Sequence, residues 1–308
     1  SKMINKSLIT GAGGFIGANL ARTLLKRGDE VFALIRPGGD TWRLAEIAND
    51  IKIIEVDIAD KEVLEKAVKE IKPEFVFHLA HYGGNRGQSD SELIHKVIVE
   101  GTANLLAVCA QIDSIKSIVN VGSSSEYGAK TEPMRENMSV EPNTEYGQAK
   151  VEATKLSKKT AVTVRPFSVY GPWESKVRLI PAVIMACLEN RAPQLANPKT
   201  VRDFIYIDDV VDALITASEN FMPGEVFNLG SGQQTSLKEI VDLIVKLTDA
   251  DIKLEWNEIA GQSFDTNTWV ADTKHSSEKL NWQAKYSLEQ GIQETIDWFK
   301  EYKELYGR

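Results

Sequence analysis

The chain has 308 residues, of which 43% are hydrophobic and 26% charged, and its formal net charge is −8. This composition is ordinary for a globular protein, and the length allows one large domain or two interleaved ones. The acidic balance argues against a nucleic-acid partner, and no apolar run approaches the roughly 20 residues that span a bilayer, so no membrane partner is expected. Two cysteines in apolar stretches, Cys109 and Cys187, and no opening signal-peptide pattern favour a cytoplasmic protein.

Apolar runs and helical periodicities alternate through about residue 165. We predict strands near 6–10, 30–36, 51–56, 74–79, 116–121 and 161–165. We predict helices near 15–27, 60–71, 91–111 and 145–159, followed by helices near 178–190, 208–220, 236–248 and 288–304 among short strands. The alternation predicts an α/β fold with a doubly wound parallel (Rossmann) sheet, accompanied by a smaller mixed α/β domain.

A glycine-rich segment, TGAGGFIG, occupies residues 10–17 between the first strand and the first helix. Glycines let backbone approach phosphates, and the N-terminus of the following helix directs N–H groups at them. Considered alone, the segment is also compatible with an ordinary glycine turn. The hypothesis is a dinucleotide pyrophosphate site that comprises Gly11, Gly13, Gly14, Phe15, Ile16 and Gly17.

The second predicted strand ends in Ile35-Arg36. A carboxylate at this place would bind the ribose 2′-hydroxyl of NAD, whereas an arginine suits the 2′-phosphate of NADP. We therefore expect NADP, with NAD less favoured, and Arg43 is available as a second guanidinium. The alternative is that Arg36 is a solvated loop residue.

Two further patterns suggest proton chemistry. A serine cluster at residues 122–128, GSSSEYG, follows the strand near 116–121, where α/β sheets place ligands. Tyr146 and Lys150 lie four apart on a predicted helix and so share a face. A protonated lysine favours the phenolate form of a neighbouring tyrosine, which could then exchange a proton with an alcohol or sugar oxygen. His78 and His81 lack carboxylate or cysteine neighbours at metal-ligand spacing, so no metal is expected.

In order and spacing these motifs resemble the extended short-chain dehydrogenase/reductase family, in its group of NAD(P)-dependent nucleotide-sugar epimerases, dehydratases and reductases. The matching segments include VDIAD at 56–60, FHLA at 77–80, YGQAK at 146–150, RPFSVYGP at 165–172, RDFIYIDDV at 202–210 and FNLGSG at 227–232. The resemblance implies a nucleotide-binding domain of residues 1–167, with returning segments 202–230 and 288–308. It implies a nucleotide-sugar domain of residues 168–201 and 231–287, and a homodimer formed through the helices near 91–111 and 145–159.

The resemblance also implies roles for individual residues. Ser123, Tyr146 and Lys150 would be catalytic, with Ser123 bonded to the reacting oxygen and Tyr146 passing the proton. The cofactor would further contact Asp57, Ile58, Leu79 and Ala80; for Asp57 the alternative is a helix N-cap, for which Asp60 is better placed. The implied contacts of the nucleotide-diphosphate sugar are His81, Ser124, Ser125, Ser168, Trp173, Arg178 and Arg202. An ion pair with Asp203 or Asp208 is the alternative for Arg202.

The family's dehydratases carry an Asp-Glu pair directly after the catalytic Ser or Thr, where this chain has Ser124 and Ser125. Glu126 comes one place later and would point the other way if the segment is extended. We therefore expect an NADP-dependent reductase of a nucleotide-activated 4-keto-6-deoxy sugar, because a reductase draws fresh cofactor at each turnover. A sugar 4-epimerase with tightly held NAD(P) is the alternative. A catalytically inactive NADP-binding sensor is a second, although such relatives usually lose the Tyr or the Lys.

Overall fold

The computed structural model describes residues 4–85, 87–257 and 267–307, which fall into two compact units. The first unit consists of Ser1–Gly128, Ser139–Pro166 and Val211–Phe227. The second consists of Ala129–Met138, Phe167–Val210 and Asn228–Arg308. In the described part of the chain, no helix has the length and apolar character needed to cross a membrane.

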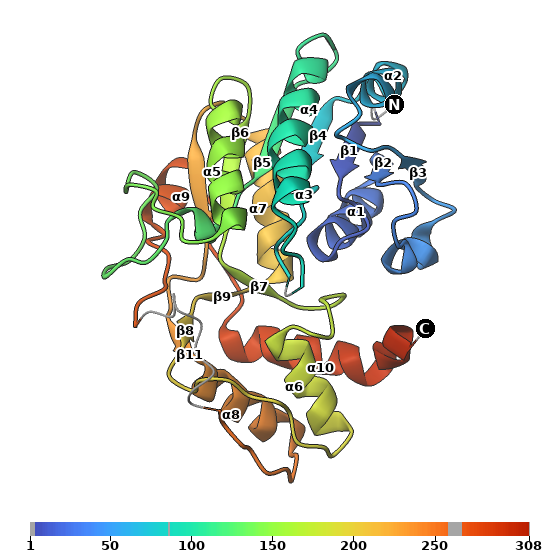
Figure 1. The fold of residues 1–308 in the computed structure, drawn as a ribbon. Helices are drawn as coiled ribbons and strands as arrows, with labels where there is room; N and C mark the ends of the chain where they lie inside the picture. Colours follow the sequence, from blue (N-terminus) through green and yellow to red (C-terminus); the bar gives the residue numbers. More distant parts are fainter. Residues whose placement is uncertain (1–3, 86, 258–266, 308) are drawn as a thin grey trace. The chain divides into compact units, whose positions relative to one another are not determined.

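A seven-stranded sheet organises the first unit (Figure 1). Its strand order is β10-β6-β5-β4-β1-β2-β3, and the neighbouring pairs from β6 to β3 are parallel. The strands are β1 (Lys6–Thr10), β2 (Glu30–Ile35), β3 (Lys52–Glu55), β4 (Phe75–His78), β5 (Ser117–Val121), β6 (Val162–Pro166) and β10 (Val226–Leu229). The predicted doubly wound parallel sheet is confirmed. Because β1 lies between β2 and β4, the strand order reverses there, which is where such sheets bind ligands.

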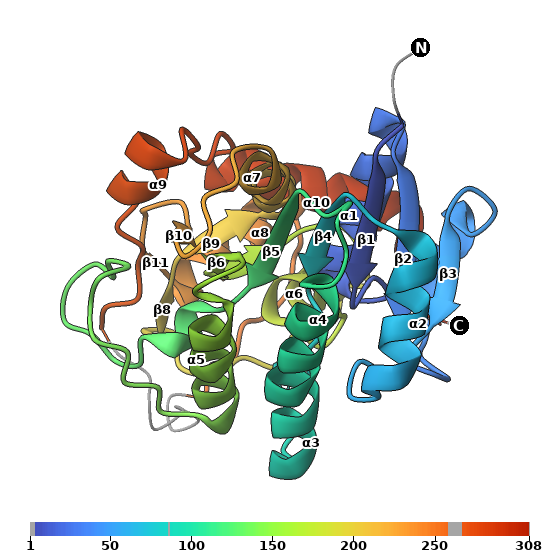
Figure 2. The ribbon, with the colours of Figure 1, turned by 90° about the horizontal axis from the view of Figure 1, so that it is seen from above.

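Helices cover both faces of this sheet. Helices α2, α4 and α5 lie on one face, and α1 and α7 lie on the other (Figures 1 and 2). Their bounds, with those of the shorter helices, are α1 (Phe15–Arg27), the 3₁₀ helix η1 (Trp42–Ile47), α2 (Lys61–Ile71), α3 (Ser91–His95), the π-helix η2 (Lys96–Glu100), α4 (Gly101–Cys109), the 3₁₀ helix η3 (Ser124–Glu126), α5 (Glu145–Ser157) and α7 (Ile207–Glu219). The single helix predicted near 91–111 is thus a helical run that contains a π-turn.

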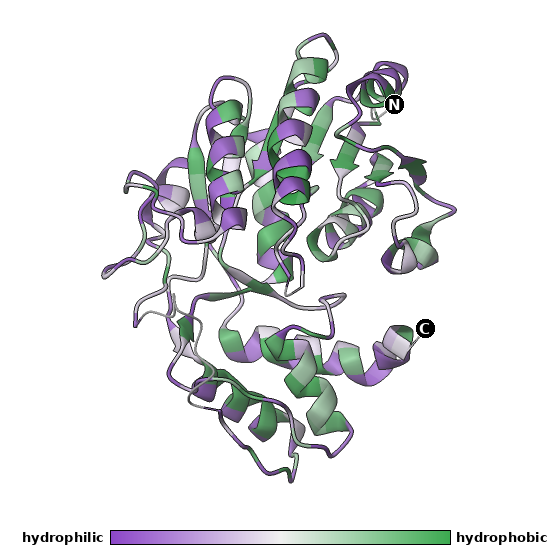
Figure 3. Cartoon of the chain, viewed as in Figure 1, coloured by the Kyte–Doolittle hydropathy of each residue, from purple (hydrophilic) through white to green (hydrophobic). Residues whose placement is uncertain are grey.

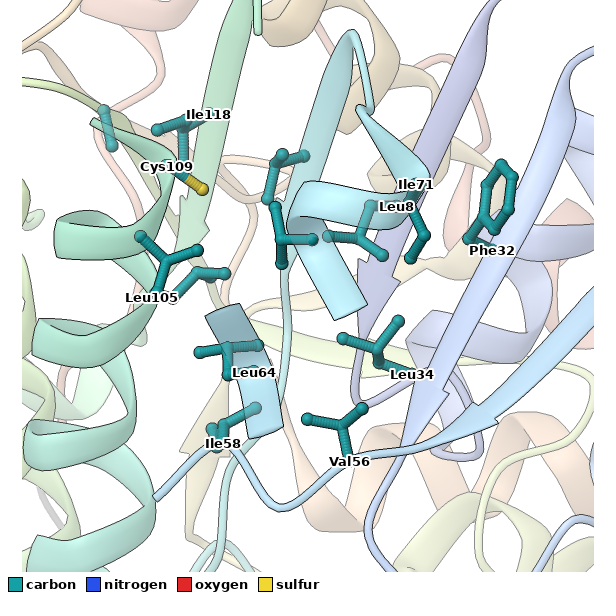
Figure 4. Close-up of a cluster of buried hydrophobic side chains, with 14 residues drawn as sticks. Leu8, Phe32, Leu34, Val56, Ile58, Leu64, Ile71, Leu105, Cys109 and Ile118 are labelled. Carbon is teal, nitrogen blue, oxygen red and sulfur yellow. The ribbon is translucent and has the colours of Figure 1, made fainter. Parts of the chain in front are cut away.

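The core of the first unit forms where α2 and α4 meet the sheet. Leu8, Leu34 and Val76 of the strands pack with Leu64 of α2 and Leu105 of α4, and Cys109 is buried among them (Figure 4). The central strands are mostly hydrophobic, whereas the edge strand β3 begins with Lys52 and ends with Glu55 (Figure 3). Helices α4 and α5 alternate hydrophobic and hydrophilic residues, as expected for helices with one buried side (Figure 3).

The second unit holds two short sheets and four α-helices among its described residues. β7 (Ser168–Tyr170) pairs in parallel with β9 (Phe204–Tyr206), and β8 (Val201–Arg202) pairs antiparallel with β11 (Thr235–Ser236). The helices are α6 (Leu179–Leu188), α8 (Leu237–Thr248), α9 (Lys274–Lys279) and α10 (Leu288–Tyr302), which the 3₁₀ helix η4 (Lys303–Gly307) follows. Cys187 is buried on α6.

These units differ from the expected domains in residues 129–138, 167, 202–210, 228–230 and 288–308, which all group with the second unit. Residues 288–308 group with the second unit, because α10 packs on α6 and α8. Residues 129–138 do so as well, because the Asn228 side chain donates to the carbonyl of Met134 (2.8 Å) and the Asn228 N–H donates to Glu136 (2.8 Å). The assignment of cofactor and sugar binding to the two domains remains a prediction.

Candidate active site

The segment after β1, Gly11–Gly17, which we call the β1 turn, has no room for a side chain at Gly11, Gly13 or Gly17. Gly11 has φ +67°, and a Cβ there would lie 2.7 Å from the backbone nitrogen of Ala80. A Cβ on Gly17 would overlap the carbonyl oxygen of Gly11. Gly14 is the N-cap of α1 and supplies no capping side chain, and the first N–H groups of any α-helix lack an acceptor within that helix. These residues therefore fit the pyrophosphate of a dinucleotide, which needs close backbone and N–H donors.

A chain of buried hydrogen bonds fixes the loop after β4 beside the β1 turn. Thr10 Oγ1 accepts from the N–H groups of Leu79 and Ala80, each at 3.1 Å, and lies 2.7 Å from His78 Nδ1. His78 Nε2 lies 2.8 Å from Thr102 Oγ1, which donates to the carbonyl of Ile98. Burial, with the nearby positive Lys150 and His81, lowers the pKa of His78 to about 3. The ring is therefore neutral, with its proton on Nε2, and Leu79 and Ala80 are held as a rigid wall of the turn.

The end of β2 carries the residues that are expected to determine whether NADP or NAD is preferred. Arg36 directly follows β2 and is exposed, and Ile35 of β2 reaches to 3.6 Å from the Cβ position of Gly13. Arg43 Nη1 donates to the carbonyl of Gly13 at 3.3 Å, and its guanidinium stacks 4.7 Å from the Trp42 ring centroid. The structure therefore brings Arg43 to the β1 turn.

The residues expected at the adenine follow β3. Asp57 is exposed and accepts from the Ala59 N–H at 2.9 Å. Ile58 is buried in the core, and its carbonyl accepts from the side chain of Asn104 at 3.0 Å. Asp60 caps α2 by accepting from Val63 N–H, as predicted, so Asp57 is not the cap.

The segment after β5, Gly122–Tyr127, which we call the β5 turn, is not extended. Ser123 Oγ accepts from the Ser125 N–H at 3.0 Å and starts η3, in which Ser124 is buried and Ser125 half-buried. Glu126 turns back, and its carboxylate accepts from the Ser123 N–H at 2.9 Å. The condition of an extended segment, under which Glu126 would point the other way, is therefore not met, because a capping box closes the turn.

Tyr146 and Lys150 lie on α5, which begins after its N-cap Thr144. Lys150 Nζ donates to the carbonyl of Val121 at 2.9 Å and lies 5.7 Å from the Tyr146 ring centroid. Burial lowers the pKa of Lys150 to about 8, and the negative charge of Glu126 opposes this shift. The structure thus brings the Tyr–Lys pair to the end of β5. This strand ends at Val121, two residues before Ser123.

His81 adds a second group beside Tyr146. Its ring packs edge-on to the Tyr146 ring, with the centroids 6.2 Å apart, and its Nδ1 lies 3.0 Å from the carbonyl of Leu79. The imidazole is exposed to solvent. The structure therefore brings the expected sugar contact His81 next to Tyr146.

The remaining expected sugar contacts belong to the second unit. Arg202 lies 5.5 Å from the Trp269 ring centroid and donates to the carbonyl of Val201. The Ser168 N–H donates to the carbonyl of Asp203 at 2.9 Å. Arg178 is half-exposed and 3.9 Å from the Glu174 carboxylate. Trp173 is only 6% exposed, and its ring lies 5.1 Å from that of Trp298, so its own unit covers it.

Sequence reasoning did not find the residues that hold this site together. Thr10, Thr102, Thr154 and Arg165 bond the elements of the site to one another, although the sequence analysis gave none of them a role. Their signal would have been polar side chains inside otherwise apolar strands and helices. Within the described residues, no group of three or more His, Cys, Asp or Glu side chains could hold a metal ion.

A parallel sheet with a glycine-lined turn at its point of reversal defines a dinucleotide-binding α/β protein. The family model for the "NAD dependent epimerase/dehydratase family" matches residues 7–230. The chain therefore belongs to that family, and the predicted family, with its NAD(P)-dependent enzymes, is confirmed.

Similarity to individual proteins extends over nearly the whole chain. A UDP-glucose 4-epimerase of Mycolicibacterium smegmatis is 29% identical over 96% of this chain and 98% of its own. A UDP-glucuronate 4-epimerase of Thermodesulfobacterium geofontis is 29% identical over 97% of each chain. A solved structure of UDP-glucuronic acid 4-epimerase from Bacillus cereus, in complex with UDP-glucuronic acid and NAD, has a TM-score of 0.85 and 27% identity and covers 96% of this chain and 99% of that one.

Proposed function

We propose that this protein is an NADP-dependent reductase that converts the 4-keto group of a nucleotide-activated 6-deoxy sugar to an alcohol. The observation that carries the chemistry is the Tyr146–Lys150 pair, buried at Lys150 and anchored to the end of β5 by the Lys150–Val121 hydrogen bond. A phenol beside a cationic amine is suited to give a proton to an oxygen that gains negative charge.

Each residue of the pair and its neighbours has a separate role in this proposal. Tyr146 donates its phenolic proton to the sugar oxygen at C4, and Ser123 Oγ donates a hydrogen bond to the same oxygen. Lys150 favours the phenolate that remains on Tyr146. A nicotinamide cofactor held by the β1 turn, Leu79 and Ala80 supplies the hydride.

The preference for NADP rests on the end of β2. This strand presents Ile35 and then Arg36, and neither can accept hydrogen bonds from a ribose 2′-hydroxyl with its side chain. Arg36 is exposed, and Arg43 lies at the β1 turn, so both guanidinium groups are available for a 2′-phosphate.

Sugar 4-epimerisation is the second candidate, and a specific observation favours it. The relatives described above are 4-epimerases of UDP-sugars, and the similarity to this chain covers nearly their full length. The solved B. cereus structure contains NAD. An epimerase uses the same tyrosine in both directions, so the β5 turn and α5 are equally suited to it.

For the sugar contacts, we propose His81, Ser124 and Ser125 from the first unit and Ser168, Trp173, Arg178 and Arg202 from the second. Arg202 would bind the diphosphate. The buried carboxylate of Asp203 accepts from Ser231, Gly232 and the Ala271 N–H, which supports a role for Arg202 other than an ion pair with Asp203. The homodimer and the cytoplasmic location also remain proposals, the first testable by sedimentation.

One experiment distinguishes the two candidate reactions. The purified protein is incubated with the 4-keto-6-deoxy sugars of dTDP, UDP, GDP and CDP in the presence of NADPH, and absorbance is followed at 340 nm. In parallel, UDP-glucose and UDP-glucuronic acid are incubated without added cofactor, and the C4 epimers are separated. Stoichiometric NADPH oxidation supports the reductase, whereas epimer formation without net oxidation overturns it in favour of the epimerase.

A further inference from the structure

A buried carboxylate, that of Glu126 in the β5 turn, has no part in the proton transfer proposed above. Glu126 is 0% exposed, and its two oxygens accept hydrogen bonds from three segments of the chain. The donors are the Ser123 N–H of the β5 turn at 2.9 Å, Thr154 Oγ1 of α5 at 2.7 Å and Arg165 Nη2 of β6 at 3.0 Å. These three elements are neighbours in the first unit (Figure 1).

The stability of the fold does not by itself account for this arrangement. Glu126 and Arg165 form a buried ion pair, and the Arg165 guanidinium stacks 4.7 Å from the Tyr127 ring centroid. Removing two charges from water costs about as much as their attraction returns, so a buried pair is weak evidence of stabilisation. What three-way bonding does provide is orientation, because the carboxylate can satisfy all three donors only in one geometry.

Two links join the β5 segment to α5, and they lie one helical turn apart. Lys150 Nζ bonds the carbonyl of Val121, just before the turn, and Thr154, four residues later on α5, bonds Glu126 within the turn. Gly122 lies between the two links, and a Cβ there would overlap the Glu126 carboxylate. The β5 turn is therefore bonded to α5 on either side of Ser123, at Val121 and at Glu126.

We infer that Glu126 is a positioning residue: through Thr154 it fixes the β5 turn against α5, so that Ser123 and the Tyr146–Lys150 pair keep one separation. This inference rests on the proposed function, since it concerns the geometry of the groups that would react. Misplacing such groups by about 1 Å can cost on the order of 10²-fold in rate without weakening ligand binding.

Thr154→Val is the informative variant. It removes the hydroxyl that links α5 to Glu126 at a half-buried position, nearly preserves side-chain shape, and leaves the Glu126–Arg165 pair in place. We expect kcat to fall about tenfold, with the KM for the sugar nucleotide and the Kd for NADPH changed less than about twofold. Thr154→Ser retains the hydroxyl and should restore the parental kcat.

Ser157→Ala is the matched control. Ser157 is also a hydroxyl residue of α5, but it is buried and donates to the carbonyl of Ala153 within its own helix at 2.8 Å. Loss of the Ser157 hydroxyl should leave kcat per folded molecule unchanged. If Thr154→Val retains the parental kcat, or if Ser157→Ala loses as much, the positioning role is contradicted.

A second measurement needs no substrate and separates this inference from the proposed function. Amide hydrogen exchange at Ser123 and Ser125 reports directly on the β5 turn, and it should accelerate at least about tenfold in Thr154→Val but not in Ser157→Ala. A parental protein that converts no nucleotide sugar would overturn the proposed function, while the exchange rates would still decide whether Thr154 holds the turn. Unchanged exchange in Thr154→Val would overturn the inference whatever the activity.

Discussion

The β1 turn and the β5 turn both follow strands of the same parallel sheet, yet they are built in opposite ways. The β1 turn has no room for a side chain at Gly11, Gly13 or Gly17, and its useful groups are backbone N–H donors. The β5 turn is filled by the Glu126 carboxylate, and its useful groups are side chains held by that carboxylate and by Lys150. A substitution at the β1 turn should therefore weaken cofactor binding because it adds atoms. A substitution near the β5 turn should lower kcat because it removes a functional group.

Tyr146→Phe should have the largest effect and tests the second half of this comparison. The variant removes only the phenolic oxygen, so kcat should fall by a factor on the order of 10²–10⁴, the usual contribution of a positioned acid or base. NADPH binding, measured by fluorescence titration, should be nearly unchanged, because the ring still packs beside His81. Turnover within a few-fold of the parent would remove Tyr146 as the acid.

Gly17→Ala tests the first half of the comparison. The added methyl group would overlap the Gly11 carbonyl, which is backbone and cannot rotate away, so the β1 turn must shift. Strain of this kind typically costs 1–3 kcal/mol, and we expect cofactor affinity to weaken by up to about 100-fold. Gly307→Ala is the control, since nothing lies near its Cβ position. If calorimetry gives Gly17→Ala the parental affinity, the cofactor does not depend on this turn.

The pH dependence of kcat/KM should reveal Lys150. Burial lowers its pKa to about 8, so the free enzyme loses the lysine proton as the pH rises through that value. Because the protonated lysine is the active form, log kcat/KM should decline above about pH 8 with a slope that approaches tenfold per pH unit. In Lys150→Arg, which stays charged, the decline should be absent from whatever activity remains. A parental profile that is flat from pH 7 to pH 10 would contradict this role.

Arg36→Ala should have an effect of about tenfold. The parental protein should bind NADPH at least about tenfold more tightly than NADH, since one charge-assisted hydrogen bond to a 2′-phosphate contributes roughly 1.5 kcal/mol or more. The variant should lose most of this preference by weakening NADPH alone. Arg191→Ala, which removes an exposed arginine paired with Glu189, controls for net charge. Equal parental affinities for the two cofactors would favour the epimerase.

The smallest effect is expected for Arg202→Ala. A half-buried arginine that binds a diphosphate should contribute about 1 kcal/mol, so the KM for the sugar nucleotide should rise roughly fivefold with little change in the melting temperature. Unchanged affinity for a free nucleoside diphosphate would place the diphosphate contact elsewhere.

The sequence predicted those parts of the fold that local patterns determine. β1 and α1 begin and end at the predicted residues, because a buried apolar strand, a glycine turn and an amphipathic helix each leave a local signal. The π-turn at Lys96–Glu100 was not predicted, since one extra residue in a helical run hardly changes its hydrophobic period.

The motifs of the candidate site could be predicted from the sequence, but the hydrogen bonds that hold its segments together could not. Tyr146 and Lys150 could be paired from their spacing alone, whereas the bond between Lys150 and Val121 joins segments 29 residues apart. The Ser-x-x-Glu capping box of the β5 turn is a local pattern, but the bonds from Thr154 and Arg165 to Glu126 join residues 28 and 39 apart in the sequence. Contacts of this kind arise from tertiary packing, and no local pattern encodes them.

The burial of both cysteines makes the chain a ready background for site-specific labelling. Burial raises the pKa of Cys109 to about 12 and also raises the pKa of Cys187, so neither thiol forms appreciable thiolate, the species that attacks maleimides, near neutral pH. A cysteine introduced at an exposed position such as Val177, which is 72% accessible, would react selectively without prior removal of the native ones. Fluorophores or spin labels can therefore be attached to the otherwise unaltered protein.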